Sequence, residues 1–157
     1  MERSGKKIKE LELIISNKYE AIDEDEIKSL GYKTAKELKN GDVILMIGDL
    51  GAGKTTITRV ILDCIGVNPL KVRSPTFNIV NTYQSNLGTV YHIDTYRVSP
   101  FELYEIGFYD YFDGKSIVII EWADKIIDDL EKADFLFKIE FNEADPRKRD
   151  LSIYKKR

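Results

Sequence analysis

A glycine-rich stretch near the middle of the chain constrains its fold and chemistry more than any other feature. It reads Gly48-Asp49-Leu50-Gly51-Ala52-Gly53-Lys54-Thr55-Thr56 and matches the P-loop pattern, in which two glycines separated by four residues precede Lys and Thr. In this pattern backbone N–H groups surround phosphate oxygens, so the chain must wrap closely without Cβ atoms in the way. We expect Lys54 to reach the β- and γ-phosphates of a nucleotide and the Thr55 hydroxyl to bind magnesium.

The segments on either side of this stretch have the structure that a P-loop requires. The run Val43–Ile47 is continuously apolar, which is typical of a strand buried on both faces. After the motif, apolar residues recur at helical spacing up to Gly66, and the N-terminus of that helix would add its positive dipole end. Because strand, loop and helix follow in the required order, phosphate binding is favoured over a plain glycine-rich turn.

Length and composition exclude several other kinds of protein. The 157 residues predict one domain over residues 1–157. One Cys and one His cannot build a Cys-rich or multi-histidine metal centre. A net charge of −3 argues against a dedicated nucleic-acid-binding domain. No apolar run approaches the ~20 residues of a membrane span, and no secretory signal is recognisable, so we expect a cytoplasmic protein with no membrane association.

The remaining patterns predict an α/β fold. The expected elements are a strand at 8–15, a helix capped by Asp23, Asp25 or Ser29 and ending at 40–41, a hairpin of 77–83 with 90–94, a helix opened by Ser99-Pro100 and ending near 113–114, and strands at 117–120, 135–141 and 151–154. We therefore predict a single P-loop NTPase-like domain. Its central sheet is mixed and mostly parallel, flanked by helices, with antiparallel strands at the ends.

Side chains at the ends of other predicted strands complete a candidate site. Glu121 ends the buried run 117–120, where P-loop proteins place a carboxylate for the metal, and it could act on water as well. Thr76 has the chain position of a residue that senses the γ-phosphate. Asp94 and Arg97 follow the second hairpin strand, and for Asp94 a structural ion pair or turn is an equally good interpretation. His92 alone favours a structural role.

The pattern favours ATP over GTP. Guanine specificity usually comes with an Asn-Lys-x-Asp segment after the metal strand, whereas the one Asn-Lys here, Asn17-Lys18, precedes the P-loop and lacks the Asp. Asp63-x-x-Gly66 resembles a GTPase switch pattern but lies in the helix after the P-loop.

Several segments in one order resemble the TsaE family, formerly YjeE, of small P-loop ATPases in bacterial tRNA threonylcarbamoyladenosine biosynthesis. The resemblance covers about residues 8 to 155 and depends on the P-loop, Ser74-Pro75-Thr76-Phe77, His92-Ile93-Asp94-Thr95-Tyr96-Arg97 and Glu121-Trp122. It implies binding of ATP and Mg²⁺, weak hydrolysis alone, and activity with the partner proteins TsaD and TsaB, which the chain would reset between turnovers. It also implies that Lys54 and Thr55 hold phosphate and magnesium, that Glu121 is the second carboxylate on the magnesium side, and that Asp94 bears on water or metal. By the same resemblance Thr76 lies on the γ-phosphate side and Trp122 on the nucleotide or the partner surface.

Two departures and two alternatives accompany this resemblance. Ile27 stands where relatives often carry a small polar residue, which puts a contact to adenosine in doubt, and Arg147 and Arg149 match only loosely. A small-metabolite kinase is the first alternative, although no Arg cluster forms a lid-like insert. The second is a non-hydrolytic ATP-sensing module in which ATP orders residues 74–83. For a TsaE-like protein the acidic balance predicts weak direct affinity for tRNA, which would be served only indirectly, through partners.

Overall fold

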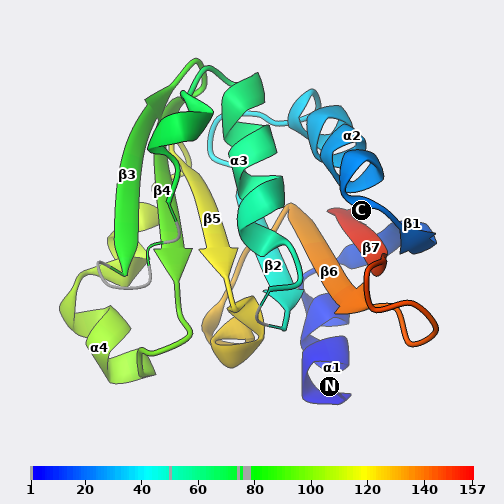
Figure 1. Ribbon diagram of the computed structural model, residues 1–157. Helices are drawn as coiled ribbons and strands as arrows, with labels where there is room; N and C mark the ends of the chain where they lie inside the picture. Colours follow the sequence, from blue (N-terminus) through cyan, green and yellow to red (C-terminus); the bar gives the residue numbers. More distant parts are fainter. Residues whose placement is uncertain (1, 50, 74, 76–78) are drawn as a thin grey trace.

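The computed structural model describes residues 2–49, 51–73, 75 and 79–157, and is built on one central sheet (Figure 1). Its seven strands lie in the order β1-β7-β6-β2-β5-β4-β3. The strands are β1 (Leu13–Ile22), β2 (Val43–Gly48), β3 (Val80–Ser85), β4 (Gly88–Asp94), β5 (Ile117–Glu121), β6 (Phe135–Phe141) and β7 (Arg149–Lys156).

Four strands in the middle of the sheet are parallel. β2 pairs in parallel with β5 and β6, and β4 pairs in parallel with β5. Antiparallel pairs lie at both ends, where β7 joins β6 to β1 and β3 pairs with β4. The central strands β2 and β5 are buried along nearly their whole length because both faces of the sheet are covered. The predicted α/β class and mixed, mostly parallel sheet are confirmed.

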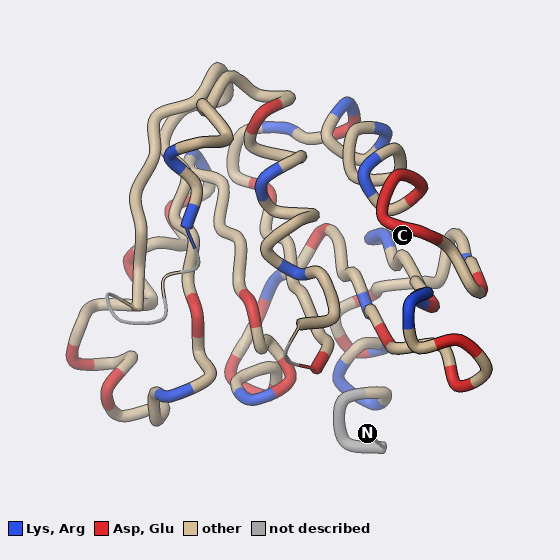
Figure 2. Tube along the Cα trace, in the orientation of Figure 1, with Lys and Arg blue, Asp and Glu red and all other residues tan. Residues whose placement is uncertain are grey.

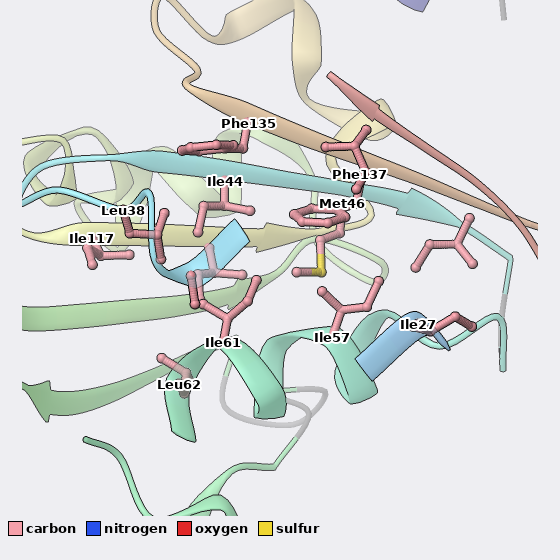
Figure 3. Packing of buried hydrophobic residues seen from close by; sticks show 14 of the residues in the cluster. Ile27, Leu38, Ile44, Met46, Ile57, Ile61, Leu62, Ile117, Phe135 and Phe137 are labelled. Atoms are coloured by element: carbon pink, nitrogen blue, oxygen red, sulfur yellow. The ribbon is translucent and has the colours of Figure 1, made fainter. Parts of the chain in front are cut away.

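Two apolar layers cover the two faces of the sheet. The described helices are α1 (Glu2–Glu10), α2 (Glu24–Ala35), α3 (Lys54–Cys64) and α4 (Pro100–Glu105), with short 3₁₀ turns η1 (Pro69–Lys71), η2 (Phe108–Tyr111), η3 (Ala123–Lys125) and η4 (Ile127–Asp129). Because side chains alternate along a strand, Ile44 and Met46 of β2 face α3, where Ile57 and Ile61 pack against them (Figure 3). Leu45 faces the opposite layer.

The largest difference from the sequence prediction lies at the N-terminus. The strand predicted at 8–15 is confirmed for residues 13–15, where β1 begins, and wrong for residues 8–12, since α1 continues to Glu10. Between them Glu12 has a φ of +62°, which turns the chain. β1 then continues through the polar stretch to Ile22, since it lies at the edge of the sheet with most side chains exposed and its backbone paired to β7.

The two caps predicted for α2 and α4 hold, although both helices are shorter than expected, α2 ending at Ala35 rather than at 40–41. Asp23 and Ser99 each form a capping box, with Glu26 and Glu102 respectively. α4 stops at Glu105 because Gly107 adopts a φ of +76°, and the chain continues as η2. Of the predicted hairpin, β3 begins at Val80, and residues 77–78 lie outside the described part. Among the described residues no helix combines the length and apolar character needed to cross a membrane.

Candidate functional site

Three segments distant in sequence meet where parallel strands end. The glycine-rich loop follows β2, Glu121 ends β5, and Asp94 ends β4. The register pairs Asp94 with Glu121 across the two neighbouring strands, and Met46 of β2 with Glu121 on the other side. Because the carboxyl ends of parallel strands lie at one edge of the sheet, the fold brings these side chains together (Figure 1).

The loop has the tight backbone that the motif predicts. Gly53 has a φ of +121°, a conformation that residues with a side chain rarely adopt, and it leads directly into α3 at Lys54. Gly48 lies so close to β6 that an added Cβ would come within 2.7 Å of the Ile139 carbonyl oxygen. Both glycines are therefore needed for geometry, Gly53 at the turn into the helix and Gly48 for packing between strands.

Lys54 lies inside the loop. Its side chain is buried, and its Nζ donates hydrogen bonds to the carbonyl oxygens of Gly48 and, at 3.0 Å, of Asp49. The ammonium group also lies 4.0 Å from the ring centroid of Trp122, within the range of a cation–π interaction. Burial lowers the pKa of Lys54, and the nearby carboxylates, Glu121 first among them, partly oppose that shift. The loop thus holds a positive charge with little water around it.

Glu121 is 2% exposed and has a partner for each carboxylate oxygen. Its Oε1 accepts a hydrogen bond of 3.2 Å from the Thr55 hydroxyl, and its Oε2 contacts Nε2 of His92. A hydroxyl and a carboxylate side by side supply the oxygen ligands that Mg²⁺ prefers. In the described part of the chain no group of three or more His, Cys, Asp or Glu is placed to hold a metal. Mg²⁺ is commonly held by one or two protein ligands together with substrate phosphates, so Thr55 and Glu121 fit it.

The wall opposite the loop is formed by the segment after β4 and the residue after β5. Asp94 is 7% exposed, and its Oδ1 accepts a hydrogen bond of 2.8 Å from the backbone N–H of Tyr96. Trp122 has a φ of +60°, and its carbonyl oxygen accepts a 2.7 Å hydrogen bond from the Thr95 hydroxyl. The rings of Tyr96 and Trp122 lie 4.5 Å apart between centroids. These contacts fix the aromatic wall beside Lys54.

A cavity of about 330 Å³ lies between the loop and this wall. Its lining consists of Gly51, Gly53, Lys54, Thr55, Thr56, Asp94, Tyr96, Arg97, Glu121 and Trp122. A second cavity, of about 250 Å³, lies on the other side of the loop and shares three of these residues. Its lining consists of Ile22, Glu24, Ile27, Gly51, Ala52, Gly53, Thr56, Arg147 and Arg149.

Most residues expected at the site from the sequence line one of these cavities. Gly48 and Asp49 lie at the start of the loop and line neither cavity, although their carbonyl oxygens hold Lys54. Ala52 is 1% exposed and lies at the second cavity. Leu50 and Thr76 lie outside the described residues.

The structure adds three residues that sequence reasoning left without a role at the site. His92 contacts Glu121, Tyr96 lines the main cavity, and Arg149 binds the loop from β7. Arg149 donates hydrogen bonds of 3.0 Å to the Ala52 carbonyl and 3.4 Å to the Gly51 carbonyl. His92 stands two positions before Asp94, so strand alternation alone puts both on one face of the sheet. No pattern in the sequence signals the contact of Arg149, which lies almost a hundred positions after the loop.

Comparison with known proteins gives a consistent result. Residues 21–151 match the family described as "Threonylcarbamoyl adenosine biosynthesis protein TsaE". A Rickettsia felis protein named "tRNA threonylcarbamoyladenosine biosynthesis protein TsaE" is 42% identical over 105 residues, which cover 66% of this chain and 61% of that protein. An Aquifex aeolicus protein of the same name is 37% identical over 85% of this chain and 92% of its own length. A crystal structure of Bacillus subtilis YdiB, 27% identical, superposes with a TM-score of 0.64 over 92% of this chain and 88% of that one.

Proposed function

The chain belongs to the TsaE family, whose members take part in tRNA threonylcarbamoyladenosine biosynthesis, and from this premise we propose that it is a magnesium-dependent ATPase of that modification. One observation carries the proposal. Lys54, Thr55, Glu121 and Asp94, from three separate segments, all line one cavity beside a phosphate-binding loop. Each of these residue types has a defined task in phosphoryl transfer.

The loop and Lys54 bind the triphosphate in this proposal. The backbone N–H groups and the start of α3 surround phosphate oxygens, and the Lys54 ammonium neutralises their charge. Lys54 now donates to two carbonyl oxygens of its own loop, so it exchanges these contacts for phosphate when a nucleotide binds. The low exposure of Lys54 strengthens that attraction, because little water screens it.

Thr55 and Glu121 would hold the magnesium ion. A bound magnesium supplies electrostatic stabilisation of the phosphates and of the charge that develops on them. Asp94 lies beside Glu121 in register, on the neighbouring strand. One of these two carboxylates orients the attacking water and accepts its proton, a task that needs a buried oxygen aimed into the cavity.

The second cavity is the place that we propose for the nucleoside. The two cavities adjoin at the loop, since both are lined by Gly51, Gly53 and Thr56. Ile22 and Ile27 offer an apolar surface for a base, and Arg147 lies at the rim. Ile27 thus supports the base through apolar contact, without a polar side chain at this position.

The protein partners that we propose are TsaD and TsaB, with tRNA contacted only through them. The chain carries 24 basic and 27 acidic residues. Figure 2 shows Lys and Arg interleaved with Asp and Glu along the described chain. Tight binding to a polyanion needs clustered positive charge, so we expect weak affinity for free tRNA at physiological salt.

ATP turnover with and without TsaD and TsaB tests the proposal. We expect weak phosphate release alone, stimulation by the two partners, and loss of both in Lys54→Ala. Lys155→Ala serves as the control, because Lys155 lines neither cavity and pairs instead with Glu37. Absence of stimulation, together with unchanged turnover in Lys54→Ala, would overturn the proposal.

Two further experiments separate the alternatives. A small-metabolite kinase would consume ATP without releasing phosphate, and a metabolite screen would reveal the phosphorylated product. A non-hydrolytic sensor would retain its cellular function in Glu121→Gln, provided that ATP and partner binding survive. Loss of cellular function in that variant, with both kinds of binding intact, would favour hydrolysis.

A further inference from the structure

A buried histidine beside the candidate site contacts Glu121 and has no role in the proposed ATPase chemistry. His92 lies in β4, is 0% exposed, and is the single histidine of the chain. Its Nε2 contacts Oε2 of Glu121. Among the described side chains, its Nδ1 is one of the buried polar atoms that make no hydrogen bond.

The buried Nδ1 without a partner lowers the stability of the fold. A histidine at this position is therefore better explained by its contact to Glu121 than by packing. A buried polar atom without a partner is unfavourable, and an apolar side chain would fill the same place in the sheet without that cost. Tyr83, on the adjacent strand β3, has its ring centroid 6.5 Å from the His92 ring and packs beside it. The imidazole is therefore enclosed, and among the described residues the polar side chain that it contacts is the carboxylate of Glu121.

The two contacts of Glu121 differ in kind. Thr55 belongs with Glu121 to the proposed magnesium pair, so the hydroxyl contact lies inside the site. His92 contacts the other oxygen from inside the sheet, one strand away from β5. For His92 to hold the carboxylate of Glu121 by a hydrogen bond, Nε2 must carry the hydrogen. Through this bond His92 fixes the rotation of the carboxyl group and leaves Oε1 directed at Thr55.

We propose that His92 is a positioning residue, which holds Glu121 in the orientation that magnesium binding and ATP hydrolysis require. This inference rests on the proposed function. His92 itself lines neither cavity and contacts Glu121, which does line the main cavity, so it acts on the site through Glu121. Groups that orient a metal ligand typically change metal affinity or activity about 10–100-fold when they are replaced.

Two amide variants separate positioning from packing. The side-chain nitrogen of Gln reaches the place of Nε2, whereas that of Asn reaches only the place of Nδ1. We expect His92→Asn to lower kcat in the presence of TsaD and TsaB, and to lower the gain in ATP-analogue affinity that magnesium brings, each about tenfold or more. Affinity measured without magnesium stays unchanged, and His92→Gln recovers most of both losses.

Ile93→Val is the matched control, because Ile93 is the next residue of β4 and packs in the opposite apolar layer. It should leave the magnesium-dependent gain in affinity at the wild-type value. Equal losses in His92→Asn and His92→Gln, or wild-type behaviour of His92→Asn, would overturn the proposal.

A measurement on the wild-type chain needs no variant to fold. With one histidine, the ring nitrogens give a single set of signals in ¹⁵N-histidine NMR. We expect Nε2 to carry a hydrogen that is protected from exchange, and a bare Nε2 would overturn the proposal. Failure of the wild type to bind or hydrolyse ATP would instead refute the proposed function, so the two failures are distinguishable.

Discussion

Replacing Arg149 with alanine should loosen the glycine-rich loop, which Arg149 contacts although it lies almost a hundred positions later in the sequence. The Arg149 guanidinium joins strand β7 to the loop through the carbonyl oxygens of Ala52, at 3.0 Å, and Gly51, at 3.4 Å. It also lies 4.1 Å from the ring centroid of Phe141 on β6. Because both carbonyl groups belong to the loop between β2 and α3, Arg149 holds this part of the loop in place.

The size of the effect follows from these contacts. A hydrogen bond that involves a charged group contributes about 1.5–3 kcal/mol, and an exposed cation–π contact about 0.5–1 kcal/mol. The Arg149 side chain is only half-buried and the contact to Gly51 is long, so water recovers much of this in the variant. We expect a loss of about 1–2 kcal/mol in the free energy of unfolding. For a chain of this length that lowers the Tm by roughly 2–8 °C.

Nucleotide affinity should fall with stability. A loop that must be ordered on binding pays for that order out of the binding free energy, and about 1.4 kcal/mol corresponds to a tenfold weaker Kd. Urea unfolding and titration with an ATP analogue measure the two effects. The single tryptophan, Trp122, lies against Lys54 and serves as the fluorescent probe.

Arg147→Ala is the control for this prediction. The Arg147 side chain is 88% exposed and pairs with Asp145, two residues away, so its removal should leave stability unchanged. Equal stability and affinity in Arg149→Ala and the wild type would refute the reasoning. An equal loss in the free energy of unfolding in both arginine variants would refute it as well.

Three further predictions concern the loop, its lysine and the strand-end carboxylate. Gly48→Ala forces a Cβ to 2.7 Å from the Ile139 carbonyl oxygen and should cost about 1–3 kcal/mol in urea unfolding, whereas Gly5→Ala, in α1 with nothing within 4 Å, should not destabilise. Burial lowers the pKa of Lys54, and affinity for the triphosphate is highest while Lys54 is protonated. The affinity measured by calorimetry should therefore fall as the pH rises through the alkaline range. Lys54→Arg stays charged and should show a smaller fall. Glu121→Gln should lower phosphate release with TsaD and TsaB about 100-fold or more and leave magnesium-free nucleotide binding intact; an active variant would contradict the role of Glu121.

Much of the fold could be predicted because its signals are local. The continuous apolar runs at β2 and β5 follow from burial on both faces, and the caps of α2 and α4 follow from Asp23 and Ser99. The N-terminal segment could not be predicted, because a short charged helix and a polar edge strand leave no clear periodicity. β1 is a strand owing to its backbone pairing with β7, which no local pattern encodes.

The residue types of the candidate site follow from the sequence alone, whereas their arrangement depends on the tertiary structure. The glycine spacing, Lys54, Thr55 and a carboxylate after an apolar run are local facts, and each implies one task at a phosphate. Which side chains contact one another depends on strand order and register, which arise from packing over the whole sheet. Those long-range pairings put His92 on Glu121, and Arg149 on the loop, through contacts that sequence spacing does not reveal.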